Sequence, residues 1–408
     1  MDYVILEAWL ELAVRWVHVI TGIAWIGSSF YFIALDLGLR KTPDLPQGVH
    51  GEEWQVHGGG FYNVQKYLIA PERLPEHLIW FKWESYTTWL SGFAMLIMVY
   101  YMGAELYLVD PNVLDIPVWQ AILISLGSLA FGWIIYDLIC KSKFGEDNTR
   151  LMVLLYIILV AMAWGYTQVF TGRAALLHLG AFTATIMTAN VFVIIMPNQR
   201  IVVDDLRNGR TPDPKYGKIA KQRSTHNNYL TLPVIFLMLS NHYPLAFASQ
   251  YNWLIAALVF LMGVTIRHYF NSAHAGKGKP MWTWAATTAL FFVIIWLSTL
   301  TAPMAADTDE ATLAPSIQRF VDADGFEAAY DVVVGNCSMC HSAEPGYDGI
   351  PWAPKGVHLE TEAQVAFEAK RIYLQAGVTH AMPPPAASYL EDEDRAVLVA
   401  WYKAATVR

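Results

Sequence analysis

Long apolar stretches alternate with short polar connections over most of the chain, and the part after about residue 302 is polar and acidic. Each stretch has the roughly 20 residues that a helix needs to cross the core of a bilayer. Hydropathy places them at 9–35, 79–108, 117–139, 151–171, 174–196, 229–248, 252–271 and 282–302. The pattern therefore predicts an all-α fold, in which a polytopic helical membrane bundle of about eight spans precedes a small second domain.

Composition agrees with this division. The chain is 55% hydrophobic and 15% charged, with a mean hydropathy of +0.32, which is too apolar for an ordinary soluble protein. The first stretch is not expected to be a cleaved signal peptide, because acidic residues precede it and no small-residue cleavage site follows. We expect a membrane domain at 1–304, a linker at 305–318 and a second domain at 319–408.

Lysine and arginine residues gather in alternate connections. The connection at 197–226 has the largest group: Arg200, Arg207, Arg210, Lys215, Lys218, Lys221 and Arg223. The connections at 103–116 and 241–251 have none. Because cytoplasmic loops are enriched in these residues, both termini are expected outside the cytoplasm. Attraction of an anionic substrate is a secondary interpretation of the basic connection.

A short motif in the second domain gives the strongest chemical signal. It reads Cys337-Ser338-Met339-Cys340-His341, the pattern that attaches a c-type haem. The thiols of Cys337 and Cys340 would bind the haem vinyl groups, and His341 and Met382 would bind the iron. A redox dithiol or half of a zinc site is the alternative, but the third cysteine, Cys140, lies far upstream. We therefore predict a small cytochrome c domain that transfers electrons.

The second domain is also expected to be helical. Helices are predicted at about 324–336 and 361–376 and from Leu390 to Ala405. Below about 100 residues such a domain has a thin core, and a covalent haem would supply the missing apolar volume.

Histidines in the outer half of the membrane domain allow two interpretations. Arg15 and His18 lie three residues apart on one helical face, and His178 and His242 fall at a similar depth. Each histidine alone is well explained as an interface anchor or a packed polar residue. In the functional interpretation, two of His18, His178 and His242 hold a b-type haem.

A second polar layer lies nearer the cytoplasm. It consists of His57, His77, Glu84, His226, His268 and His274, with Asn190, Asn227 and Asn228 close to the same depth. Ionisable groups at membrane depth are costly and are often functional. The candidate catalytic residues are His57, Glu84, His226 and His268.

The connection at 36–78 is longer than the others, and long ordered loops are often functional. It contains His57 followed by Gly58-Gly59-Gly60, and glycines let a backbone approach a flat ligand closely. A flexible surface loop is the alternative interpretation.

Several stretches of the membrane part resemble a known family. They are Arg15-Trp16-Val17-His18, the run from Gly22 to Tyr31, His57-Gly58-Gly59-Gly60-Phe61-Tyr62 and the run from Lys82 to Trp89. Together with the haem motif, they resemble the bacterial membrane-bound urate oxidase (urate hydroxylase) with a C-terminal cytochrome c domain. The resemblance covers essentially the whole chain.

The resemblance implies oxidation of urate to 5-hydroxyisourate without hydrogen peroxide, with electrons passing to haem c. The implied partners are urate, a respiratory terminal oxidase or another electron acceptor, and the lipid bilayer, with no nucleic acid. The implied location is the bacterial inner membrane, with the cytochrome c domain in the periplasm. The resemblance does not identify the catalytic residues of the membrane domain.

Urate is a planar anion, so its site needs a cation, amide groups, an aromatic or glycine floor and a base. Its hydroxylation by water releases two electrons, and haem c accepts one at a time. A site in the inner layer, across a core of about 30 Å from haem c, would require a relay such as haem b. The rival interpretations are a non-catalytic subunit that passes electrons from quinol or a partner enzyme to haem c, and a haem-bearing structural subunit of a respiratory complex.

Overall fold

The structure is a computed structural model that describes residues 3–68, 71, 74–300, 313–348, 350, 352–384 and 387–406. It is 70% helix and 5% strand. Its contacts divide the chain into two compact units. The larger unit comprises Ala8–Asn241 and Leu245–Leu300, and nearly all of the smaller unit follows residue 300.

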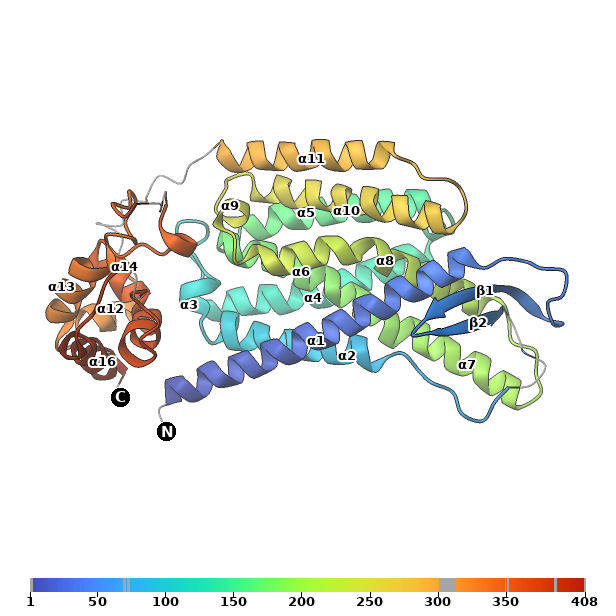
Figure 1. Cartoon of the computed structure of the whole chain (residues 1–408), viewed down its shortest axis with the longest axis horizontal. Helices are drawn as coiled ribbons and strands as arrows, with labels where there is room; N and C mark the ends of the chain where they lie inside the picture. The colour runs from blue at the N-terminus through green and yellow to red at the C-terminus, as the bar shows by residue number, and fades with distance from the viewer. Residues whose placement is uncertain are drawn as a thin grey trace. The chain divides into compact units, whose positions relative to one another are not determined.

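The larger unit is a bundle of long helices (Figure 1). Its helices and helical turns are α1 (Tyr3–Gly38), α2 (Trp83–Met95), η1 (Leu96–Tyr101), α3 (Ala104–Tyr107), α4 (Val118–Lys141), η2 (Lys143–Glu146), α5 (Asn148–Thr167), α6 (Gly172–Ala189), η3 (Asn190–Ile195), α7 (Met196–Arg207), α8 (Lys215–Ser240), α9 (Pro244–Phe247), α10 (Asn252–His274) and α11 (Trp282–Thr299). The α6, η3 and α7 segments run on without a break as one long helix.

Six helices in the described part of the chain are long and apolar enough to cross a membrane. They are Tyr3–Gly38, Val118–Lys141, Asn148–Thr167, Gly172–Arg207, Asn252–His274 and Trp282–Thr299. The other two predicted spans correspond to less regular segments. The stretch 79–108 contains α2, η1 and α3, and the stretch 229–248 overlaps only the second half of α8. The predicted bounds of that last span are wrong, because its helix begins at Lys215 and ends at Ser240.

Small residues let the helices of the bundle approach closely. A Cβ atom added at Gly263 of α10 would lie 2.6 Å from Cδ of Pro233 in α8. One added at Gly132 of α4 would lie 2.0 Å from Cε2 of Phe182 in α6. Because lipid provides little hydrophobic drive for helix association, close packing of this kind is a main source of stability in membrane bundles.

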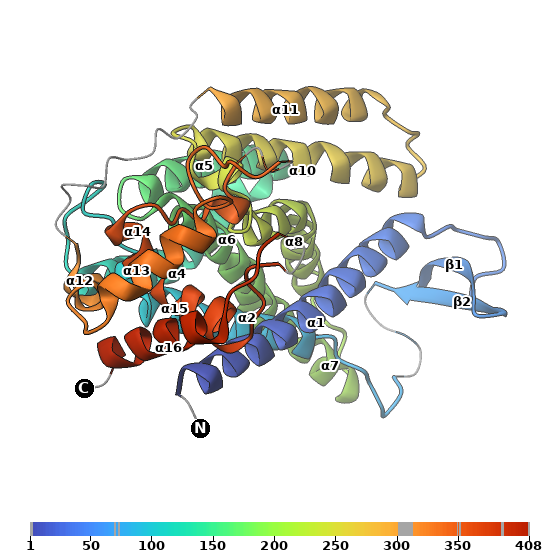
Figure 2. The same ribbon diagram turned by 60° about the vertical axis from the view of Figure 1, so that its left-hand side comes forward.

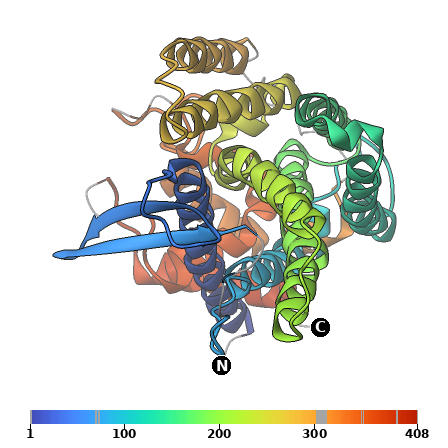
Figure 3. The same cartoon turned by 90° about the vertical axis from the view of Figure 1, so that its right-hand side faces the viewer.

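The long connection after α1 contains a β-hairpin, so the expectation of an all-α fold is wrong for this segment. Strand β1 (Val49–His57) pairs in antiparallel fashion with β2 (Gly60–Tyr67), and the hairpin projects from the bundle (Figure 3). Gly58 and Gly59 form its turn with φ of +59° and +81°. Two positive φ values in a two-residue turn favour glycine, so the turn explains these two glycines.

The smaller unit is a compact helical domain, with α13 and α16 packed against each other (Figure 2). Its elements are α12 (Pro315–Val321), α13 (Phe326–Cys337), η5 (Pro354–Gly356), α14 (Glu362–Phe367), α15 (Ala369–Ile372), η6 (Tyr373–Val378) and α16 (Asp392–Thr406). The predicted helices at 324–336 and from Leu390 to Ala405 are confirmed by α13 and α16 to within a few residues, and the predicted helix at 361–376 is divided into α14, α15 and η6. Helix α12 was not predicted and overlaps the end of the expected linker, whose residues 305–312 lie outside the described residues.

Aromatic rings fill the core of the smaller unit. Tyr402 of α16 stacks on Tyr373 with ring centroids 4.4 Å apart, and on Phe320 at 5.6 Å. The indole Nε1 of Trp401 donates a hydrogen bond to the carbonyl oxygen of Phe320 over 2.8 Å. These contacts attach α16 to both α12 and η6.

The close packing at Gly132 can be tested against a glycine of the same helix. Gly132→Ala should destabilise the protein by about 1–3 kcal/mol, because the methyl group overlaps Phe182. Gly127→Ala is the matched control, since nothing lies within 4 Å of its added Cβ and both substitutions gain similar helix propensity. Thermal unfolding in detergent measures the difference, and equal melting temperatures would contradict this account of the α4–α6 contact.

Candidate functional site

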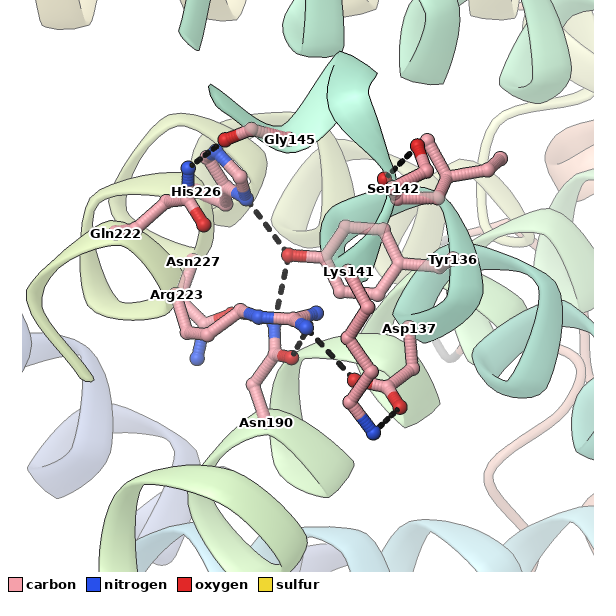
Figure 4. A network of polar contacts seen from close by, with 11 residues as sticks. Tyr136, Asp137, Lys141, Ser142, Gly145, Asn190, Gln222, Arg223, His226 and Asn227 are labelled. Atoms are coloured by element: carbon pink, nitrogen blue, oxygen red, sulfur yellow. Dashed lines mark hydrogen bonds and ion pairs between the residues drawn. The ribbon is translucent and has the colours of Figure 1, made fainter. Parts of the chain in front are cut away.

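A buried polar network joins three helices inside the larger unit (Figure 4). Helix α4 contributes Tyr136 and Asp137, and Asn190 stands where α6 continues into η3. Helix α8 contributes the remaining members, Arg223, His226 and Asn227. The α8 residues are three and four positions apart and therefore share one helical face. All six side chains are buried.

The network is organised around a buried ion pair. Nη2 of Arg223 lies 2.7 Å from Oδ1 of Asp137, and the two side chains are 2% and 8% exposed. The guanidinium also lies over the Tyr136 ring, with Cζ 4.9 Å from the ring centroid. Lys141 contacts the other carboxylate oxygen of Asp137 over 2.6 Å from a largely exposed position. One carboxylate therefore faces two cations, and the network has excess positive charge.

Hydrogen bonds extend from this pair to His226. Nδ2 of Asn190 donates to the hydroxyl oxygen of Tyr136 and to Oδ1 of Asn227, both over 3.1 Å. The Tyr136 hydroxyl lies 2.7 Å from Nδ1 of His226. Since the tyrosine oxygen already accepts from Asn190, we assign its hydrogen to the bond with His226. Neutral His226 then has its own proton on Nε2.

Two donors of this network lack an acceptor. Nε2 of His226 and Nε of Arg223 are buried, and neither has a partner in the part of the chain that the structure describes. Buried polar groups are nearly always satisfied, so such atoms call for an explanation. An acceptor supplied by a ligand or by water would satisfy both groups.

The local backbone places Asn190 at a change of helix type. The α-helix ends at Ala189 and a π-helical turn runs from Asn190 to Ile195. Short π-helical turns inside α-helices are rare and occur frequently at functional sites.

The structure separates the four catalytic candidates predicted from the sequence. Only His226 belongs to the buried network. His57 is exposed beside the hairpin turn, and Glu84 is half-buried in the first turn of α2. His268 is exposed on α10, with its ring centroid 6.0 Å from that of Trp282. No hydrogen bond, ion pair or ring contact in the described part of the chain joins these three to the network.

Sequence reasoning missed several members of the network. Tyr136 and Asp137 lie within the predicted span 117–139. The carboxylate of Asp137 inside an apolar span could have pointed to a functional site there. Arg223 had been assigned to a topology-setting connection, but it is buried within α8. The sequence does predict that Asn190 and Asn227 lie at about the same depth as His226.

The outer histidines have different surroundings. Nδ1 of His18 lies 2.9 Å from the Thr88 carbonyl oxygen, which leaves Nε2 for another partner. Both ring nitrogens of His178 are used, by the Ala174 carbonyl at 2.8 Å and the Ser125 hydroxyl at 2.9 Å. His242 is exposed in the connection after α8. The b-type haem stays a prediction, and His178 would have to give up a hydrogen bond to bind iron.

The haem-attachment motif lies at the end of α13 in the smaller unit. The carbonyl of Cys337 accepts hydrogen bonds from the amides of Cys340 at 3.1 Å and His341 at 2.9 Å, which forms a tight turn. Nδ1 of His341 donates to the carbonyl of Val357 over 2.9 Å. The proton is therefore on Nδ1, and the lone pair of Nε2 is available to a metal.

These residues suit a covalent haem better than the alternatives. Burial raises the pKa of Cys337 to about 11, whereas redox dithiols have a lowered thiol pKa. The described residues contain no group of three or more His, Cys, Asp or Glu arranged to hold a metal ion, as a zinc site would need. The main chain of Met382 is fixed by two hydrogen bonds, from its amide to Gln375 at 2.9 Å and from Arg395 to its carbonyl at 3.0 Å.

The larger unit is thus a bundle of membrane-length helices with a positively charged polar network inside it. A family model described as "Urate oxidase N-terminal" matches residues 4–298, and the chain belongs to this family. The match identifies a urate oxidase-related protein and an enzyme of the oxidoreductase type. No curated protein and no solved structure matched the chain.

The ion pair can be tested by removing either partner. Asp137→Asn should destabilise the protein by about 3–5 kcal/mol, because it leaves Arg223 buried without a carboxylate. Arg223→Gln should cost less, because Asp137 keeps its contact with Lys141. Thermal unfolding of the purified variants in detergent measures both. A larger loss for Arg223→Gln would contradict the proposed charge balance.

Proposed function

We propose that this protein oxidises urate to 5-hydroxyisourate within its membrane domain and passes the electrons to a c-type haem in its second domain. The family match over residues 4–298 is the observation that carries the proposal. The buried network supports it, because an anionic substrate would be attracted by excess positive charge. The haem would be held by Cys337, Cys340, His341 and Met382.

The reaction requires acceptors for protons as well as for electrons. Urate and water give 5-hydroxyisourate, two protons and two electrons, with the water oxygen bonded to C5. The hydrogen bond from Tyr136 to Nδ1 of His226 offers a path for one proton. In this scheme the Tyr136 oxygen takes a proton from the substrate side as its own proton moves to Nδ1 of His226, so the phenol remains neutral and His226 ends protonated.

The electrons must leave the substrate one at a time. When bound, the haem accepts one electron at a time, so each urate must deliver electrons in two steps. Cys337 and Cys340 would fix the haem covalently, and His341, oriented by Val357, would bind the iron. The positive-inside pattern supports placing this domain in the periplasm of a bacterial inner membrane, from where electrons would continue to a respiratory oxidase.

Anaerobic addition of urate to the purified, oxidised protein should reduce the c-type haem, which absorption spectroscopy detects directly. The expected stoichiometry is two haems reduced per urate consumed. A quinol serves as the comparison substrate. Reduction by quinol but not by urate would reject the proposal in favour of an electron-transfer subunit without substrate chemistry.

The iron ligand can be tested separately from urate oxidation. Met382→Ala should lower the reduction potential of the haem, because an axial thioether raises it. Met339→Ala is the matched control, since this methionine lies within the attachment motif and is 46% exposed. Redox titration measures both variants. An unchanged potential in Met382→Ala would exclude this residue as the ligand.

A further inference from the structure

A second buried polar cluster, distinct from the network around Arg223, joins helices α1, α8 and α10. It consists of Arg267 and Asn271 on α10, Asn228 on α8 and the ring of Phe30 on α1. Arg267 is 5% exposed and Asn228 is fully buried. The two α10 residues are four positions apart and share a helical face.

Arg267 differs from Arg223 in having no carboxylate. Its hydrogen bonds go to amides, from Nε to Oδ1 of Asn228 at 3.2 Å and from Nη2 to Oδ1 of Asn271 at 3.0 Å. No ion pair to Arg267 occurs within the described residues. A buried charge without a counter-ion is costly, so the position is expected to serve a ligand that supplies the negative charge.

The orientation of Asn228 adds a second, independent sign of a ligand. Because the guanidinium can only donate, the Asn228 atom that faces it must be the amide oxygen. That oxygen also accepts from Nδ2 of Asn271 over 3.1 Å. The amide nitrogen of Asn228 is therefore a donor, and it is buried without a partner among the described residues. A cation and an unsatisfied donor together require an acceptor-rich anion.

The aromatic ring favours a planar anion. Phe30 covers one face of the guanidinium, with Cζ of Arg267 4.0 Å from the ring centroid. The guanidinium is planar, and the ring packs against its face and leaves its edge for hydrogen bonding. The bonds to the two amides use Nε and one hydrogen of Nη2, so Nη1, the second hydrogen of Nη2 and the Asn228 amide nitrogen are the donors available to a ligand. Guanidinium groups recognise flat, delocalised anions through such edge contacts.

We propose that Arg267 and Asn228 bind the anionic heterocycle of the substrate, urate, through its carbonyl and deprotonated ring atoms. This assignment rests on the proposed function and names the residues that hold its substrate. Asn228 follows His226 and Asn227 directly in α8, so one helical turn contributes to both buried clusters. Arg267, which sequence reasoning missed, is the cation that a site for urate needs.

Binding can be measured without catalysis by keeping the haem fully reduced with dithionite, so that urate cannot be oxidised. Radiolabelled urate is then titrated against the full-length protein. Arg267→Gln should weaken binding by roughly 10- to 100-fold, as expected for loss of a charge-assisted hydrogen bond. Arg200→Gln is the matched control, because it removes the same charge from an exposed position. Equal affinity in Arg267→Gln and the wild type would overturn the assignment.

Asn228→Asp provides a second variant that is expected to fold. Its carboxylate can accept the same bonds from Arg267 and Asn271, so thermal stability should be retained or increased. The variant should nevertheless lose urate binding, because the cation is neutralised and the free donor is removed. Wild-type affinity in Asn228→Asp would refute the site even if urate reduces the wild-type haem. Failure of urate both to bind and to reduce the wild type would instead reject the proposed function, and the site with it.

Discussion

The cost of charge in an apolar interior governs the structure of the larger unit. Its long helices are apolar on most faces, so each buried ionisable group needs a partner from another helix. Arg223 has such a partner in Asp137, and their contact joins α8 to α4 across the bundle. Removing Asp137 leaves Arg223 charged in an apolar medium, whereas Asp137 without Arg223 keeps only Lys141, so the pair is a constraint on helix position.

The same constraint distinguishes the two buried arginines. Arg223 is paired with a carboxylate, whereas Arg267 is surrounded by amides and an aromatic ring. Folding alone does not explain a buried guanidinium that has no carboxylate partner, such as that of Arg267. Helix α8 carries Arg223 and contacts Arg267 through Asn228. Its first half is more polar than the membrane-length helices, so it can supply the polar side chains of both clusters.

Hydropathy predicted much of the helical architecture, because long apolar helices can be recognised from the composition of a sequence window alone. It placed the start of α8 incorrectly because the polar residues from Lys215 to Asn228 resemble a loop. Arg223 and the run from His226 to Asn228 are nevertheless buried, whereas Lys215, Lys218 and Lys221 are exposed. The hairpin was missed although the run Glu53-Trp54-Gln55-Val56-His57 alternates polar and apolar residues as a strand does, because the connection was judged by its length and its glycines. Of the catalytic candidates, His226 lies in the buried network. The partners of Arg223 and Arg267 depend on contacts between distant segments, which no local pattern contains.

The way in which Arg395 holds the main chain at Met382 has a mechanical consequence. This buried side chain of α16 donates to the carbonyls of Ala376 and Met382, so the last helix anchors the main chain at Met382 and six residues before it. The Met382 side chain itself remains 38% exposed. With the main chain anchored, the sulfur of Met382 can change position by rotation about the side-chain torsions alone.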